Sequence, residues 1–102
     1  MPQSLQTILS TCDEIEELLR TAAPGPDTRT LNRISALAAS MGGRDSYLTD
    51  QTNKLVTRAA IYFSNRRHQT AQGGAEGVMR EMRYSLLKGI RERVDTLKNQ
   101  TQ

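Results

Sequence analysis

The chain has 102 residues, of which 36% are hydrophobic and 25% charged, and its formal net charge is +3. This length corresponds to one domain, and the composition excludes both a low-hydrophobicity disordered segment and a membrane-spanning protein, which needs roughly 18 consecutive apolar residues. With one cysteine, Cys12, and one histidine, His68, neither a disulfide framework nor a Cys/His zinc site is expected.

The charge is distributed unevenly along the chain. Residues 1–51 carry a net charge of −3, whereas residues 52–102 carry +6. Such a chain is suited to self-association, to an acidic partner or to phosphate, and the sign does not choose among them. The amino-terminal segment lacks the basic start and apolar stretch of a signal peptide, so we expect a cytoplasmic protein.

Apolar spacing predicts a first helix over SLQTILSTCDEIEELLRTAA, residues 4–23, before Pro24-Gly25-Pro26 stops it. Its seam has intervals of three and four residues: Leu5, Ile8, Cys12, Ile15, Leu19 and Ala22. Seams of this kind pack along another helix, and the first five of these residues are candidates for a protein interface. The acidic run Asp13–Glu17 indicates a solvated face or a docking surface for a neighbouring chain. No Glu/His pair supports a metal site.

A second helix of about 14 residues is expected to start at Asp27 or Thr28 and to end at Gly42-Gly43. Around this turn, four positions resemble the helix-turn-helix pattern of bacterial repressors: Leu37, Ala38, Gly42 and Leu48. Gly43 and Gln51 depart from that pattern, because both stand where apolar residues are usual. We therefore expect an ordinary helical hairpin, since a glycine turn between helices does not require DNA.

The third helix is predicted to start near Asp45 or Ser46 and to run toward Gly73-Gly74, with an end at 64–72 that protrudes or frays. The fourth covers AEGVMREMRYSLLKGIRERVDTLKNQ, residues 75–100. Its apolar face comprises Val78, Met82, Leu86, Ile90, Val94 and Leu97. Gly89 lies beside this face and would let another helix approach closely.

No segment has the alternating pattern of a strand. We therefore expect an all-α antiparallel bundle of three to four helices, with two long C-terminal helices, in a single domain over residues 1–102. Long helices around a thin core favour a homodimer or a larger assembly.

The stretch IYFSNRRHQTAQGG raises the question of nucleic-acid binding. Arg66, Arg67 and His68 either occupy the last turns of the third helix, where cations complement the helix dipole, or form a phosphate-binding surface with basic residues of the fourth helix. Those residues are Arg80, Arg83 and Lys88.

No nucleophile motif or phosphate loop occurs, so neither an enzyme nor a cofactor is expected. The first hypothesis is a non-catalytic helical protein-interaction module, such as an adaptor, a chaperone or a small structural subunit of a larger assembly. The alternative is a small nucleic-acid-binding subunit that contacts phosphate backbones through the basic surface of the third and fourth helices.

Overall fold

The computed structural model describes residues 4–43, 45–64 and 74–100. It is an all-α bundle of four helices, and the described residues contain no strand, which confirms the predicted fold class. Three helices are α1 (Leu5–Arg20), α2 (Thr28–Met41) and α3 (Ser46–Tyr62). The fourth, called the last helix below, is 27 residues long and comprises α4 (Gly74–Glu81), the π turn η1 (Met82–Leu86) and α5 (Leu87–Gln100). None of these helices is both long and apolar enough to cross a membrane.

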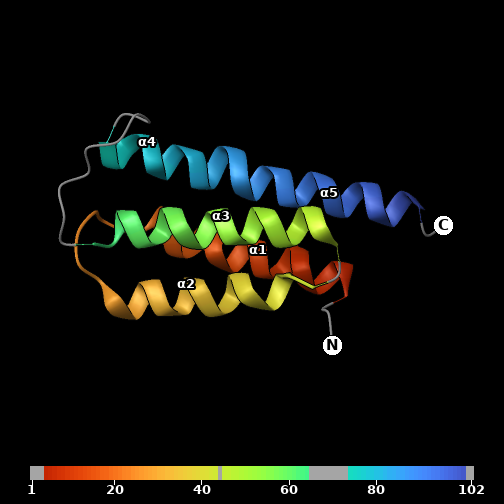
Figure 1. Ribbon diagram of the computed structural model, residues 1–102, viewed down its shortest axis with the longest axis horizontal. Helices are drawn as coiled ribbons and strands as arrows, with labels where there is room; N and C mark the ends of the chain where they lie inside the picture. The colour runs from red at the N-terminus through yellow and green to blue at the C-terminus, as the bar shows by residue number, and fades with distance from the viewer. Residues whose placement is uncertain (1–3, 44, 65–73, 101–102) are drawn as a thin grey trace.

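Successive helices run antiparallel, and the last helix lies along one side of the other three (Figure 1). Each of α1, α2 and α3 begins at a side chain that caps it. The Ser4 hydroxyl and the carboxylates of Asp27 and Asp45 each accept a hydrogen bond from the backbone amide three residues later. These residue types satisfy amides that the first helical turn leaves without partners. The predicted helix starts at residues 27–28 and 45–46 are therefore confirmed.

All four helices contribute to one hydrophobic core. Its fully buried side chains include Ile15 of α1, Ile34 of α2, Leu55 of α3 and Ile90 of the last helix. Tyr62 and Phe63 are also buried, with their rings edge to face and 5.0 Å between centroids. Both rings therefore belong to the core.

The third helix ends before the predicted stop at Gly73-Gly74. It ends at Tyr62 after 17 residues. The backbone amides of Gly25 and Asp27 donate to the carbonyls of Tyr62 and Phe63 at 3.1 and 3.4 Å. In a longer helix those carbonyls would accept bonds from the following turn. Here the backbone amides of the loop between α1 and α2 donate to these carbonyls instead.

A π turn interrupts the last helix, and the sequence pattern explains why. Val78, Met82, Leu86, Ile90 and Val94 follow one another at intervals of four residues. In a regular α-helix each such step overshoots a full turn by about 40°, so four steps would carry these side chains about 160° around the axis. The π turn accommodates one extra residue and returns them to one face. All five are buried, with relative exposures of 0–4%.

The segment that resembles a helix-turn-helix forms a hairpin. Figure 1 shows α2 and α3 side by side with nearly parallel axes, whereas a helix-turn-helix pair crosses at about 90–120°. Gly43 has φ of +91°, a left-handed conformation that favours glycine in this turn. At Gly89, the neighbouring atoms from another helix belong to side chains of α3. A Cβ at this position would lie 3.1 Å from the Tyr47 hydroxyl of α3.

Candidate functional site

The polar contacts of the last helix converge first on Glu16 of α1. One Glu16 carboxylate oxygen accepts from Arg83 Nε at 2.6 Å, and the other accepts from Arg91 Nη1 at 3.1 Å. Arg91 also donates to Asp13 at 3.0 Å. Glu16 and Arg83 are only 25% and 23% exposed. This cluster attaches α1 to the last helix within the π turn, through Arg83, and beyond it, through Arg91.

The protonation of Glu16 follows from these contacts. Burial alone would raise the pKa of the carboxyl, because it disfavours the charged form. The hydrogen bonds from Arg83 and Arg91 outweigh burial and hold the pKa of Glu16 below its usual value. The carboxylate is therefore ionised at neutral pH and serves as a structural anion, not as a proton donor.

Two further ion pairs attach the last helix to the rest of the bundle. Arg93 donates from Nε and Nη2 to the two oxygens of Asp45, at 3.0 and 2.8 Å. Arg58 of α3 donates to Glu81 at 2.7 Å. The Asp45 pair and the Glu16 cluster join acidic residues of the first half of the chain to basic residues of the second, whereas Arg58 and Glu81 both belong to the second half. Several charges that make the two halves of the chain opposite in sign therefore form ion pairs with each other within the molecule.

The six candidate phosphate contacts do not form one surface in the described residues. Arg66, Arg67 and His68, and both interpretations offered for them, lie outside the described residues. Arg83 turns toward Glu16. Arg80 and Lys88 are exposed.

These two exposed cations differ in their partners. Arg80 lies 3.8 Å from Glu76 in a solvent-exposed pair. Within the described part of the chain, Lys88 makes no ion pair. Both side chains are therefore accessible to a partner.

The candidate interface on α1 is occupied within the chain itself. Ile8, Cys12, Ile15 and Leu19 have relative exposures of 0–1%, and Leu5 is half-buried against the same core. A partner that bound through them would have to displace the chain's own helices. The Cys12 thiol lies 3.7 Å from the Met41 sulfur, and burial raises the pKa of this thiol to about 11.

Sequence reasoning missed an exposed tyrosine in the π turn. Tyr84 is 60% exposed, the largest value for a large hydrophobic side chain in the described residues. The Arg83 guanidinium carbon lies 5.1 Å from the centre of the Tyr84 ring, within the range of a cation–π contact. Because Glu16 holds Arg83, the ring is supported from α1. The sequence did contain a signal for this exposed ring, because Tyr84 lies midway between Arg80 and Lys88 and outside the apolar face of the helix.

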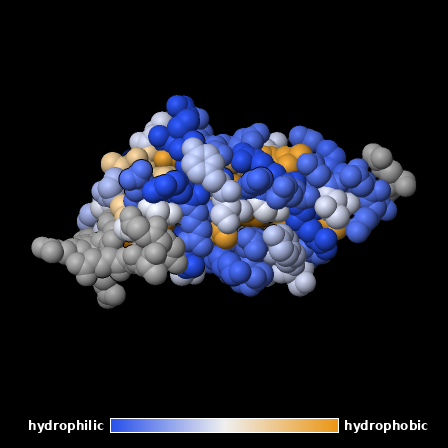
Figure 2. Space-filling model, turned by 90° about the horizontal axis from the view of Figure 1, so that it is seen from above, coloured by the Kyte–Doolittle hydropathy of each residue, from blue (hydrophilic) through white to orange (hydrophobic). Residues whose placement is uncertain are grey.

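The surface formed by the last helix is mostly hydrophilic. Figure 2 shows this side of the bundle, with apolar residues visible only in small, separate areas. Tyr47 and Tyr84 are the exposed large hydrophobic side chains of the described residues. Tyr47 is 44% exposed and lies near Arg93, whose guanidinium carbon is 6.0 Å from the ring centre. Any contact on this face therefore depends on single aromatic groups and charges.

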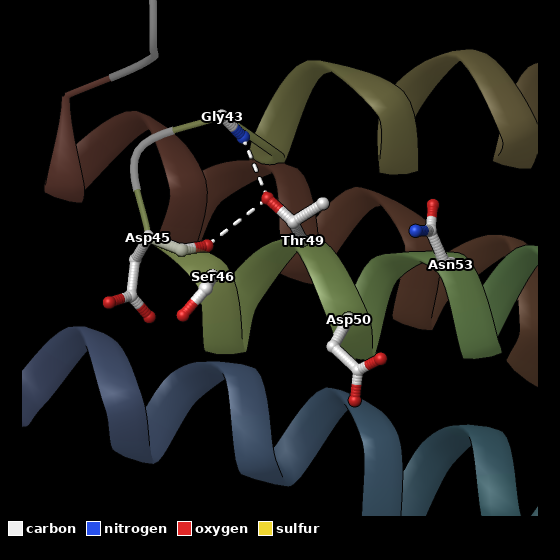
Figure 3. A pocket seen from close by; sticks show the side chains of 6 residues that line it. All are labelled: Gly43, Asp45, Ser46, Thr49, Asp50 and Asn53. Atoms are coloured by element: carbon white, nitrogen blue, oxygen red, sulfur yellow. Dashed lines mark hydrogen bonds between the residues drawn. The ribbon is translucent and has the colours of Figure 1, made fainter.

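A polar hollow of about 480 Å³ lies beside the turn between α2 and α3 (Figure 3). It is lined by Gly43, Asp45, Ser46, Thr49, Asp50 and Asn53. The Thr49 hydroxyl accepts from the Gly43 amide at 3.0 Å and donates to the Asp45 carbonyl at 3.1 Å. The carboxylate of Asp45 is held by Arg93, and that of Asp50 lies 3.4 Å from Lys54. These contacts stabilise the turn and leave no carboxylate of the hollow without a partner.

No group of three His, Cys, Asp or Glu residues in the described ranges is arranged to hold a metal ion. Comparison of the chain with protein-family models, with curated proteins and with solved structures found no match.

Proposed function

We propose that the protein is a non-catalytic protein-interaction module that binds through the outer face of the last helix. The observation that carries this proposal is Tyr84, which is 60% exposed while its ring is supported by Arg83 and, through it, by Glu16. Tyrosine and arginine are enriched where protein interfaces derive their affinity, because a rigid aromatic ring offers a large contact area at little entropic cost. An exposed ring that contacts a held guanidinium is suited to insertion into a partner's pocket.

Two features of the bundle support a role in binding. The four helices share a core formed within one chain, so the fold does not need a second chain to bury its apolar residues. The hydroxyl and carboxyl groups at the α2–α3 hollow are engaged in capping, turn contacts and ion pairs. Neither the hydrophobic core nor the α2–α3 hollow offers an activated nucleophile or a general base.

The alternative, a subunit that contacts phosphate backbones, is favoured by the exposed Arg80 and Lys88. It is weakened by Arg83, whose charge is neutralised by Glu16 at 2.6 Å. Phosphate affinity grows with the number of free cations on one face. The other three of the six candidate contacts are residues 66–68, which lie outside the described ranges.

A capture experiment from native extract separates the two functions. Wild-type protein, Tyr84→Ala and Tyr47→Ala are immobilised and exposed to extract with and without nuclease. We expect nuclease-resistant protein partners, retained by Tyr47→Ala and reduced at least about fivefold by Tyr84→Ala, since a buried interface tyrosine contributes more than about 1 kcal/mol. If nuclease removes all captured material, the phosphate alternative replaces this proposal.

A further inference from the structure

A regular series of exposed residues runs along the last helix. Glu76, Arg80, Tyr84, Lys88 and Glu92 follow one another at intervals of four residues, and all five are exposed. We call the three central residues, Arg80, Tyr84 and Lys88, the outer row. It consists of one aromatic ring between two cations, with an anion beyond each end.

The π turn aligns the outer row. In a regular α-helix, the two steps from Arg80 to Lys88 would rotate the side chains by about 80° around the axis. The π turn Met82–Leu86 lies between them and accommodates one extra residue. The same turn that keeps Val78 and Ile90 on the inward face therefore keeps Arg80 and Lys88 on the outward face.

The spacing and charge of the outer row define a short binding surface. At 1.5 Å rise per residue, Arg80 and Lys88 are roughly 12 Å apart along the helix, with Tyr84 midway. Glu76 and Glu92 restrict the positive surface to this length, because either would repel an anion that extended beyond it. A nucleic-acid backbone continues past such a surface, whereas a protein segment can place two negative charges only where they are needed.

Building on the proposed function, we infer that the outer row binds an acidic protein segment with two carboxylates about 12 Å apart and an apolar side chain between them. The carboxylates pair with Arg80 and Lys88, and the apolar side chain packs on the Tyr84 ring. In an extended segment this distance corresponds to about four residues, and alternate side chains point the same way. The recognised pattern is therefore acidic-x-apolar-x-acidic.

A titration followed by ¹⁵N NMR tests this inference directly on the full chain. The probes are a short Gly/Ser peptide that contains Glu-Ser-Leu-Ser-Glu and its analogue with Lys in place of both Glu residues. We expect saturable shifts that centre on residues 80–88 with the acidic peptide, and binding at least about tenfold weaker with the basic one, because two favourable charge pairs become repulsive.

A charge reversal gives the decisive comparison. The double variant Arg80→Glu/Lys88→Glu should prefer the basic peptide, while Arg29→Glu, at an exposed cation of α2, should keep the wild-type preference. Tyr84→Ala should weaken binding of the acidic peptide about fivefold, and Tyr47→Ala should not. All five positions are exposed, so the variants are expected to fold, which circular dichroism checks.

Three outcomes would overturn the inference. They are equal binding of the two peptides, an unchanged preference in the double variant, and tighter binding of a ten-nucleotide single strand than of the acidic peptide at residues 80–88. Any of these would leave the proposed function intact if the captured partner remains nuclease-resistant and sensitive to Tyr84→Ala. Loss of that partner in the capture experiment would instead contradict the proposed function.

Discussion

Deletion of Ser85 tests whether the π turn exists to absorb one extra residue. Ser85 is exposed and lies within Met82–Leu86. Its removal should convert the π turn into an α turn and leave Val78 and Ile90, both fully buried, on the same face. Because no buried side chain leaves the core, we expect the free energy of unfolding to change by less than about 1 kcal/mol.

A deletion from a helix without a π turn should behave differently. Ser10 is also an exposed serine, and it lies in α1 between Ile8 and Cys12, which are fully buried. Its removal would rotate one part of α1 against the other by about 100°. Turning Ile8 out of the core should lower the free energy of unfolding by about 2–5 kcal/mol, the range for loss of a large buried side chain.

Urea denaturation followed by circular dichroism at 222 nm measures both effects. The wild type, the Ser85 deletion and the Ser10 deletion are compared at the same protein concentration. The free energy of unfolding should depend on urea concentration with the same slope in all three proteins. Differences between their transition midpoints then report differences in stability. If the Ser85 deletion is as destabilising as the Ser10 deletion, the extra residue has no relation to the alignment of the apolar face, and the explanation of the π turn is refuted.

Three further predictions concern the core and the Glu16 cluster. Ile15→Asp should abolish cooperative unfolding of the single chain, because it buries an unpaired carboxylate at a fully buried position; a normal thermal transition would contradict this. Glu16→Gln should be less stable than the wild type at neutral pH. Since Arg83 and Arg91 hold the pKa of Glu16 below its usual value in the folded state, the unfolded chain takes up the proton first as pH falls. The difference in unfolding free energy should therefore shrink below the ordinary glutamate range, and a difference that is constant from pH 7 to pH 3 would argue against the cluster. Cys12 should react with iodoacetamide at pH 8 at least about 100-fold more slowly in native than in urea-unfolded protein, because burial raises the pKa of its thiol to about 11. Equal rates would show that α1 does not bury this residue.

Local sequence signals predicted most helix boundaries. Asp27 and Asp45 are capping residues whose carboxylates accept the expected amide bonds, and both helices start where those residues predict. The end of α3 was not predictable in the same way. Its last carbonyls are bonded by Gly25 and Asp27, which precede them by more than 30 residues in the sequence. Local periodicity carries no information about such contacts.

The candidate site was harder to predict than the fold. A basic residue such as Arg83 has the same local pattern whether it faces phosphate or a carboxylate of its own chain. Its partner, Glu16, lies 67 residues away. The four-residue intervals of the last helix did carry a signal for the π turn, because an α-helix cannot keep them on one face. The exposure of Tyr84 follows from that turn.

The contacts between α1 and the last helix also bear on how the chain folds during synthesis. They join residues 67 to 78 positions apart. At about 5–20 residues per second, a ribosome needs roughly 4–15 s to make the segment between such partners. Throughout that interval the nascent α1 has no last helix to cover it, and the α2–α3 hairpin is itself made only during this time. The acidic residues Asp13 and Glu16, unpaired at this stage, give the early chain a negative surface that disfavours association between nascent chains before the bundle closes.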